Sequence, residues 1–544
     1  MPRITPGRSC LECQRRKIKC NRAAPCGYCV KTRIRCVYPP GRPGIVPTNG
    51  DGDRSVISRI EAIEKRLVGF ERGLEGIRRL IEDGRSDGVR FDEPVSVSLH
   101  PSPVVMSFLW QTYLETVDPV LKIFHVPTVQ RQITGVMRGK SVDGRMECLV
   151  FAIYYSAVVS LSAKGCLDEL EEERSVLLKR YRTGFENALS KVDLADMTVL
   201  QAFVLYLICG RRDEHGPDVS ARLKTAIDAA FKINLHHEAS RVSPFEVEMR
   251  RRLWWHIYIL DVRTAEDTGS EPSILESSFD TLLPLNIDDG SLHHDMGEPV
   301  GRVGKTEMLF TLARFKVSSF ARQVVFSDQF CRDNGYMVLS PGQKCNSIDE
   351  FRQQMEDGYL RHCDKKIPFD FITVAATRLI LVKLKLTVTK QRTSQNSLSQ
   401  GNFQKVCVEV LQHARKLRLY EKGQRWLWLF QTYVEWDALG YLLIDLCAFQ
   451  NEAAWSVADE VYQYWKNHDI RDQRWGQIEE LYSQADGFRG LRLDNSAGVS
   501  PSSHDNFDPS ESMGEAPASG TACEWSVGMF ERYFQVLDTQ TTWL

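Results

Sequence analysis

The sequence contains no uncharged apolar run long enough to cross a membrane as a single helix. Its longest such run, from Cys148 to Ala163, is shorter than the roughly 18 to 20 residues that a membrane-spanning helix needs. The first ten residues, MPRITPGRSC, also lack the apolar core of a secretion signal. We therefore expect neither secretion nor membrane insertion, and a buried helix is the better interpretation of the run.

Acidic residues are nearly absent from the first 45 positions, where Glu12 faces eleven lysines and arginines. The balance reverses from Asp494 onward, where Arg532 is the only base among eight acids. A basic beginning and an acidic end predict a polyanion partner at one end of the chain and a protein partner at the other. With 544 residues, 43% of them hydrophobic, the chain has room for several domains.

The sequence also lacks a residue set that predicts catalysis. GRVGKT (301–306) is similar to a phosphate-binding loop, but Pro299 stands where that motif needs its first glycine. The pairs His236–His237 and His293–His294 have no metal-binding partners at ligand spacing, so we expect them to cap or pack. Arg250–Arg252 precede Leu-Trp-Trp, which favours a helix at the core edge. We therefore predict that the chain is not an enzyme, against the rival hypothesis of a catalytic domain over 104–490.

The cysteines are divided between a scattered set and a regular one. Nine of the fifteen lie irregularly between Cys148 and Cys523, which is typical of reduced thiols rather than a disulfide framework. The other six follow the pattern C-x2-C-x6-C-x5-C-x2-C-x6-C. They are Cys10, Cys13, Cys20, Cys26, Cys29 and Cys36. Residues 10–20 and 26–36 align without a gap, so each half is one C-x-x-C turn leading into one short basic helix.

The six cysteines predict two bound zinc ions. Structural zinc prefers four tetrahedral ligands, so two ions need eight thiolate bonds, and six sulfurs supply eight only if two of them bridge. The symmetric choice is Cys10 and Cys26, the first of each half. The alternatives are a single-zinc ribbon with two spare thiols and a disulfide knot. Since so short a segment has little other core, we expect folding and metal binding to be one event.

This segment resembles the six-cysteine, two-zinc cluster of fungal transcription factors over residues 10–39. The resemblance implies bridging by the first cysteine of each half, in agreement with the counting argument. It also implies that the first short helix enters the DNA major groove and that Arg16 and Lys17 read a CGG triplet, whose guanines offer O6 and N7 acceptors. The expected phosphate contacts, which give affinity without sequence information, are Arg15, Lys19, Lys31, Arg33 and Arg35. For each of these bases, the alternative is a solvated charge that balances the cluster.

A regular ladder of apolar residues follows the linker. The residues at the a and d positions of a coiled coil include Ile60, Ile63, Leu67, Phe70, Leu74 and Ile77. Arg59 and Arg66 then fall at g positions opposite Glu64 and Glu71 at e positions, so a parallel dimer gains attractive pairs. The alternative is an amphipathic helix packed on its own chain. Gly69, Gly73 and Gly76 weigh against the dimeric coil, because glycine weakens a helix and the coil is short.

From about residue 104 to 490 the pattern predicts helix after helix and almost no strands. Examples of expected helices are 145–163, 217–235, 245–267, 369–389, 403–420 and 425–449. Three stretches, 108–128, 244–269 and 279–289, resemble the regulatory middle region of the same family. That resemblance implies control of the factor, sometimes by a small molecule, and identifies no effector.

The last segment is rich in Ser, Pro and Asp, which predicts disorder over 494–520. It ends in an acidic, aromatic stretch, 524–544, for which two interpretations are equally favoured. One is an activation segment that binds coactivators. The other is a helix docked on the regulatory domain through Phe530, Phe534 and Leu537.

Together these features predict a mainly α, zinc-dependent, nuclear DNA-binding regulator of RNA polymerase II genes, either a dimeric activator or a repressor or architectural binder. Secondary-metabolite gene clusters, primary metabolism and drug response all remain open as targets. The expected domains are a zinc cluster (1–44), a linker (45–55), a dimerising coil (56–83), a second linker (84–103), an all-α regulatory domain (104–490) and a disordered acidic tail (491–544).

Overall fold

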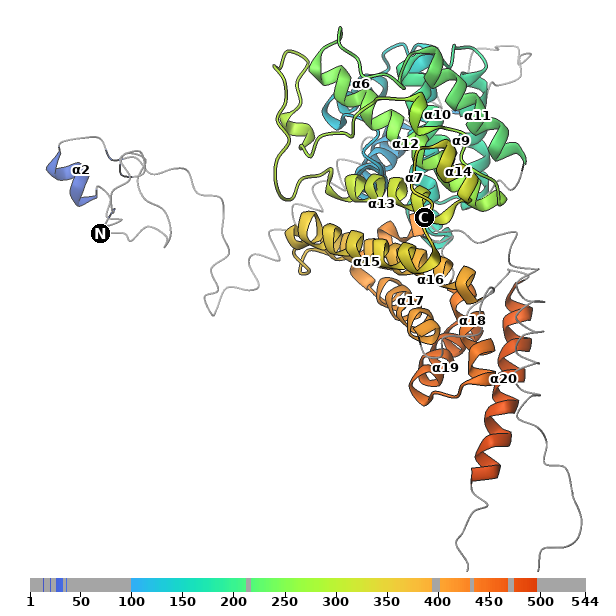
Figure 1. The fold of residues 1–544 in the computed structure, drawn as a ribbon. Helices are drawn as coiled ribbons and strands as arrows, with labels where there is room; N and C mark the ends of the chain where they lie inside the picture. The colour runs from blue at the N-terminus through green and yellow to red at the C-terminus, as the bar shows by residue number, and fades with distance from the viewer. Residues whose placement is uncertain are drawn as a thin grey trace, which may run out of the picture. The chain divides into compact units, whose positions relative to one another are not determined.

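The computed structural model divides the chain into two compact units, Met1–Ser96 and Val97–Leu544. It describes Cys13, Cys20, residues 26–32, Cys36, and residues 99–211, 217–393, 402–430, 435–467 and 474–496. Every regular element within these ranges is helical (Figure 1). The mainly α class predicted from the sequence is therefore confirmed. The predicted coil (56–83) and the tail beyond residue 496 lie outside the described residues.

The second unit begins with a group of helices, drawn from blue to yellow-green in Figure 1. A π-helical turn, η1 (Tyr113–Val117), joins the first two of them. The helices of this group are α4 (Pro103–Thr112), α5 (Asp118–Leu121), α6 (Val126–Met137), α7 (Gly144–Ser160), α8 (Ala163–Leu170), α9 (Arg174–Leu189), α10 (Met197–Gly210), α11 (Pro217–Lys232), α12 (Pro244–Thr268), α13 (Leu309–Val325) and α14 (Asp328–Asp333).

A second group of helices, yellow to red in Figure 1, completes this unit. It packs on the first group where α13 lies against α16. Its helices are α15 (Pro341–Gly358), α16 (Pro368–Thr393), α17 (Asn402–Arg418), α18 (Trp436–Ala448), α19 (Glu452–Lys466) and α20 (Arg474–Ser496). In the described part of the unit, four 3₁₀ segments connect its helices. They are η2 (Glu276–Ser278), η3 (Asp289–Ser291), η4 (Leu360–His362) and η5 (Glu421–Phe430).

Short polar side chains fix where many of these helices begin. Each accepts a hydrogen bond from a backbone N–H of the first turn, a group that has no partner within the helix. Ser340 adds the reciprocal bond of a capping box with Gln343. These capping residues are Ser102, Asp143, Ser162, Asp196, Ser243, Ser327, Ser340 and Asn451.

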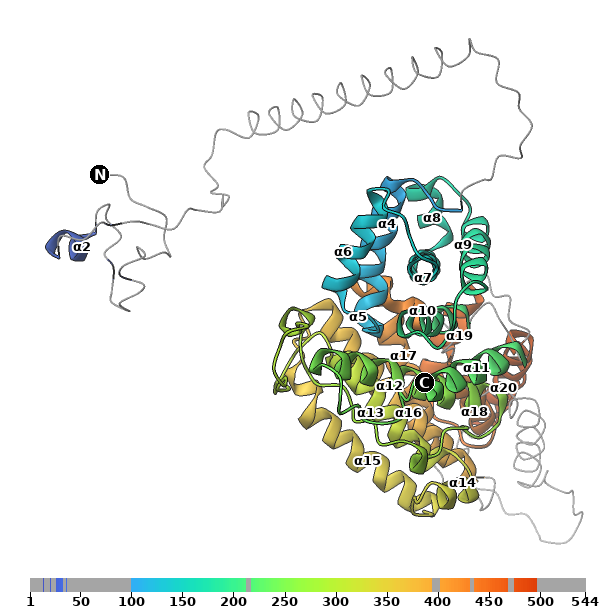
Figure 2. The same ribbon diagram turned by 90° about the horizontal axis from the view of Figure 1, so that it is seen from above.

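Helix α7 is the centre of the first group. All residues from Cys148 to Val159 are buried, because α9 and α10 pack on α7, and α4, η1 and η5 also lie against it. Figure 2 shows α7 end-on, with α9 and α10 next to it. Gly184 of α9 allows the close approach: a Cβ at this position would lie 2.4 Å from a ring carbon of Phe151. The apolar run that is too short for a membrane span is therefore a core helix, as predicted.

No single helix in the described part of the chain has the length and apolar composition of a membrane span. The pair α7 and α8 reaches that length and composition only when taken together, and the chain bends by 117° between them.

The predicted helix boundaries agree closely with the structure for five of the six segments. The expected ranges 145–163, 217–235, 245–267, 369–389 and 403–420 correspond to α7, α11, α12, α16 and α17. Among the described residues, α4 begins at Pro103 and α20 ends at Ser496, whereas the regulatory domain was expected to span 104–490.

The prediction of one helix over 425–449 is wrong. This range holds the end of η5 and then α18. An α-helix would point Trp426 and Trp428, two residues apart, to nearly opposite sides. Here both indole N–H groups donate to carbonyls of the π-helical turn, to Glu115 and Thr116 at 2.9 Å each. These two long-range hydrogen bonds therefore determine the conformation of the segment, and the local apolar pattern, which predicted an α-helix, does not.

Candidate zinc centre and the charged core of the regulatory unit

In the first unit, the second C-x-x-C turn forms the start of helix α2 (Gly27–Lys31). Cys26 precedes the helix and caps it, because its Sγ accepts the backbone N–H of Cys29 at 3.5 Å. The backbone N–H of Cys26 points to Cys36 Sγ at 3.3 Å. N–H groups at a helix N-terminus favour the thiolate over the thiol. The turn therefore brings three sulfurs together and stabilises the charge that zinc ligands carry.

The first half of the repeat contributes Cys13 to the same place. The Sγ atoms of Cys13 and Cys26 are 3.6 Å apart, and with Cys29 they form a buried group whose sulfurs all lie within 4.8 Å of one another. A disulfide would need about 2.05 Å. Two thiolates bound to one tetrahedral zinc at about 2.3 Å stand roughly 3.8 Å apart. The sulfur spacing therefore fits zinc ligation and excludes a Cys13–Cys26 disulfide.

Of the other three predicted zinc ligands, the structure describes Cys20 and Cys36 but not Cys10. Cys20 is nearly buried and packs in the same cluster as Cys13, Cys26 and Cys29. Cys36 is half-buried against it. Cys10 lies outside the described residues, so its role as the second bridging ligand stays a prediction. Cys26 lies beside a sulfur of each half, those of Cys13 and Cys29, which is compatible with its predicted role as a bridging ligand; that role also stays a prediction.

Of the predicted DNA contacts, the structure describes only Lys31, which is exposed in the last turn of α2. The others lie outside the described residues. They are Arg15, Arg16, Lys17, Lys19, Arg33 and Arg35.

The regulatory unit has a buried charged cluster that the sequence analysis missed. Lys122 ends α5 with a left-handed backbone (φ 51°), and its Nζ lies 2.8 Å from Asp118, 3.3 Å from Asp289 and 2.8 Å from Glu307. Arg252 of α12 is fully buried and binds the other oxygen of Asp289 at 2.7 Å. Asp289 therefore joins α5 and α12, which lie in two of the stretches that resemble the family's middle region.

The cluster extends along α12 through Glu248. This carboxylate accepts from Arg252 at 3.1 Å and from the backbone N–H of Leu285 at 3.0 Å, fixing the loop that leads to Asp289. The signal in the sequence was an acid and a base four residues apart in an otherwise apolar stretch, VDPVLKIF (117–124).

Burial and the local charges shift the pKa values in this cluster. Burial, together with Asp289 and Glu307 nearby, raises the pKa of Asp118 to about 6, even though Lys122 opposes the shift. Burial lowers the pKa of Lys122, but its three carboxylates outweigh that effect and raise it overall. Lys122 therefore stays charged at every physiological pH and holds the cluster together electrostatically.

Removing Lys122 should be strongly destabilising. Lys122→Ala leaves buried carboxylates without their cation, which costs about 3 to 5 kcal/mol of unfolding free energy. The matched control is Lys232→Ala, which removes an exposed pair with Asp193 and should cost less than about 1 kcal/mol. Chemical unfolding of the two full-length variants measures the difference. Equal and small losses would show that the cluster is not a stabilising element.

The three consecutive arginines, Arg250 to Arg252, are bound by groups of the same unit. Arg250 donates to the carbonyls of Ile233 and Asn234, and Arg251 pairs with Glu238. With Arg252 buried, the three arginines pack at the core rather than forming a surface patch, as predicted.

One histidine of each pair packs on an aromatic ring, as expected, and the lysine of GRVGKT pairs with a carboxylate. The ring of His236 packs on Phe231 at 4.3 Å between centroids, and that of His294 on Phe245 at 4.0 Å. Lys305, the lysine of GRVGKT, lies 2.7 Å from an oxygen of Asp370. It is therefore engaged by a carboxylate of this chain.

Comparison with known proteins agrees with these two units. Residues 8–43 match the model of the fungal Zn(2)-Cys(6) binuclear cluster domain, and residues 110–337 match that of the fungal specific transcription factor domain. The first match covers the cysteine repeat and α2. The second covers the chain from the end of α4 to α14, including the charged cluster around Asp289. These matches define a zinc-cluster DNA-binding transcription factor with two bound zinc ions.

The chain is also similar to individual fungal regulators. The Aurofusarin cluster transcription factor aurR2 of Gibberella zeae is 30% identical over 522 residues, which cover 85% of this chain and 76% of that one. The Transcriptional regulator nsrM of Aspergillus novofumigatus is 26% identical over 554 residues, covering 84% and 75%. The Pyriculol/pyriculariol biosynthesis cluster transcription factor 1 of Pyricularia oryzae is 37% identical over 233 residues, covering 41% and 31%. The chain belongs to the family of fungal Zn(2)-Cys(6) binuclear cluster transcription factors.

Proposed function

We propose that this protein is a nuclear regulator that binds DNA sites containing CGG triplets and controls a secondary-metabolite gene cluster. The observation that carries the proposal is the buried sulfur group of Cys13, Cys26 and Cys29 within the matched cluster domain. The repeat also places a run of bases, Arg15 to Lys19, between the second and third cysteines of its first half. Folding around zinc would present these bases on one short helix.

The basic residues of the repeat have two roles in the proposal. Arg16 and Lys17 of the first half donate to guanine O6 and N7 in the major groove. The remaining bases neutralise phosphates, so they set affinity and salt dependence rather than sequence preference. These are Arg15, Lys19, Lys31, Arg33 and Arg35. The exposure of Lys31 on α2 is compatible with a phosphate contact.

We also propose that two copies bind together through residues 56–83. The apolar residues recur at alternating spacings of four and three from Val56 to Ile81, which is the period of a coiled-coil seam. A parallel dimer of this kind holds two clusters side by side. It therefore favours sites with two CGG half-sites over sites with one.

A charge in the seam should remove that preference. Leu67→Asp places a carboxylate at an a position, where a dimer would bury it without a partner. Val68→Asp is the matched control, because position 68 falls on the outer face. We expect Leu67→Asp to lower affinity for a duplex with two half-sites by about 10- to 100-fold, from the loss of effective concentration, and to leave a single half-site unchanged. Titration of both variants on the two duplexes measures this, and equal behaviour would rule out the seam as the interface.

The pathway and the direction of control are part of the same proposal. The names of two relatives describe transcription factors of an aurofusarin cluster and of a pyriculol/pyriculariol biosynthesis cluster, which favours a gene-cluster regulator here. We propose activation, with the acidic aromatic segment 524–544 recruiting coactivators of RNA polymerase II, and no catalytic activity. Mapping of bound sites in chromatin, combined with transcript levels after deletion, tests this. Bound sites away from any biosynthetic cluster, or transcripts that rise on deletion, would contradict it.

A further inference from the structure

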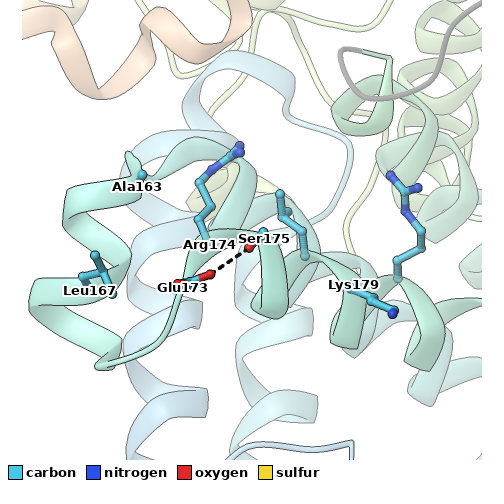
Figure 3. Close-up of a pocket in the computed structure, with 8 residues that line it drawn as sticks. Ala163, Leu167, Glu173, Arg174, Ser175 and Lys179 are labelled. Atoms are coloured by element: carbon cyan, nitrogen blue, oxygen red, sulfur yellow. Dashed lines mark hydrogen bonds between the residues drawn. The ribbon is translucent and has the colours of Figure 1, made fainter.

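A groove between helices α8 and α9 offers a ligand no buried polar partner. Figure 3 shows Leu167 of α8 beside it and, at the start of α9, Ser175 donating to Glu173. Arg174 donates to backbone carbonyls at the end of α7. Every side chain that lines this groove is exposed or half-buried. The search for a binding site therefore turns to a more enclosed part of the regulatory unit.

A smaller cavity lies where helices α6, α10 and α12 begin. Its volume is about 200 Å³. Its buried apolar residues belong to two packing clusters, the main core of the unit and a small separate cluster at the start of α12. Those of the main core are Phe124, Val129 and Leu149, and those of the separate cluster are Phe245 and Met249. The cavity is therefore a seam between two clusters that the side chains lining it do not fill.

Gln201 of α10 gives this cavity a buried hydrogen-bond acceptor. The side chain is only 9% exposed, and its Nε2 donates to the backbone carbonyl of Ile123 at 3.1 Å. A carbonyl oxygen can only accept, so this bond fixes which end of the amide is the nitrogen. The other end, Oε1, accepts no hydrogen bond from a described residue. Because Gln201 lines the cavity, a donor placed there would satisfy this oxygen.

The histidine that lines the cavity is held in its neutral form. Nε2 of His125 lies 3.0 Å from the backbone carbonyl of Asp289, so this nitrogen carries the proton. Nδ1 then accepts from the hydroxyl of Thr128 at 2.8 Å. Burial lowers the pKa of His125, which favours the same neutral ring. The one lining side chain with a permanent charge is Glu246, and it is exposed.

These surroundings disfavour a negatively charged ligand. The first turns of α6, α10 and α12 have N–H groups that attract anions, but Asp289, Asp196 and Ser243 already accept from them. No side chain of the lining carries a permanent positive charge. An anion would therefore lose its hydration without gaining a charged partner, and the cavity fits a neutral molecule.

The remaining lining favours a flat ring. Four aromatic side chains contribute to it, Phe124, His125, Phe245 and His294. The rings of His125 and His294 lie 4.9 and 4.0 Å from that of Phe245, between centroids, and such clusters accept a further ring by edge or offset contact. A cavity of about 150 Å³ is enough for benzene. The space here therefore accommodates one aromatic ring with small substituents.

We propose that this cavity binds a neutral, single-ring aromatic compound that donates a hydrogen bond to Gln201 Oε1, a phenol being the simplest member of the class. The ring lies between Val129 of the main core and Phe245 of the separate cluster, and so fills the seam between them. Its hydroxyl group satisfies the buried acceptor. The inference does not rest on DNA recognition by the zinc cluster.

A series of small ligands tests the chemistry on the unaltered full-length protein. Calorimetric titration should show 4-methylphenol binding at least about 10-fold more tightly than 4-methylanisole, in which a methyl group replaces the donated proton and leaves the acceptor unpaired. The anion 4-hydroxybenzoate should bind more weakly than 4-methylphenol. Absence of saturable binding, equal affinity for the phenol and its ether, or tighter binding of the anion would each overturn the proposal.

Hydrogen exchange and two variants then locate the site. Bound 4-methylphenol should slow amide exchange in residues 125–132, 197–201 and 243–249, since a ligand suppresses local opening around it. Val129→Phe extends a side chain into the space and should lower affinity for 4-methylphenol by about 10-fold or more. Val136→Phe is the matched control, the same change on the same helix outside the lining, and should bind as the unaltered chain.

Gln201→Met separates the acceptor from the shape of the cavity. Methionine keeps a similar volume but offers only a weak acceptor, so the preference for 4-methylphenol over 4-methylanisole should fall to about onefold while affinity for the ether stays constant. A preference that persists in Gln201→Met, or protection confined to other segments, would overturn the proposal. DNA titrations with these samples report separately on the zinc cluster, so failure of one proposal is distinguishable from failure of the other.

Discussion

Cys26→Ser should abolish specific DNA binding and lower the zinc content below two ions per chain. Cys26 lies between Cys13 of the first half and Cys29 and Cys36 of the second, so its loss removes a ligand at the point where the two halves meet. Structural zinc supplies on the order of 10 kcal/mol or more of folding free energy in small domains. We therefore expect affinity for a CGG duplex to drop by at least about 10³-fold, to the non-specific level.

The variant is measured against two others. Cys345→Ser changes a half-buried thiol of the regulatory unit and should leave zinc content and DNA binding intact. Cys13→Ser should be no more damaging than Cys26→Ser, because a bridging sulfur serves both metals. Zinc content by mass spectrometry and affinity by titration give the comparison. Two zinc ions retained in Cys26→Ser would contradict the bridging role.

Lys17→Ala and Arg33→Ala should separate base readout from charge. The two positions are equivalent in the repeat, yet only Lys17 is expected to donate to guanine. Lys17→Ala should cost roughly 1 to 3 kcal/mol on a CGG site and much less on scrambled DNA. Arg33→Ala should weaken both DNAs alike and reduce the salt slope by about 1 per half-site, as expected for one lost phosphate contact.

Binding across a salt series on CGG and scrambled duplexes distinguishes these outcomes. If Lys17→Ala weakens both duplexes equally, Lys17 contacts only phosphate. The reading residue would then be sought at Arg16. A loss of specificity in Arg33→Ala would instead assign readout to the second half of the repeat.

The fold class and the positions of five of the six helices predicted were accessible from the sequence because they depend on local periodicity. Helices α7, α12 and α16 carry apolar residues over most of their length and begin or end at strong local signals such as Asp143, Ser243 and Gly269. The 425–449 segment was not, since its conformation depends on indole hydrogen bonds to η1, more than 300 residues earlier in the chain. A sequence pattern does not contain such a contact.

The sequence predicted the metal ligands of the first unit but not the buried charged cluster of the second. The zinc ligands follow from spacing, because a C-x-x-C turn places two sulfurs at the start of one short helix, as Cys26 and Cys29 show. The charged cluster of Lys122, Asp289 and Arg252 did not follow, since Asp289 lies 167 residues from Lys122 and 37 from Arg252 in the chain and the three become partners only after the helices pack. Chemistry carried by local spacing is visible in sequence, whereas chemistry assembled by tertiary packing is not.

The central claim, that a zinc-held fold reads a specific DNA sequence, is tested most directly by titrating the full-length protein on a CGG duplex and a scrambled duplex, with and without a zinc chelator. We expect the CGG duplex to bind about 10³-fold or more tightly at physiological salt, and the chelator to remove that preference because the ligand set folds only around the metal. Equal affinities for the two duplexes before chelation, or a preference that survives complete removal of zinc, would contradict the account.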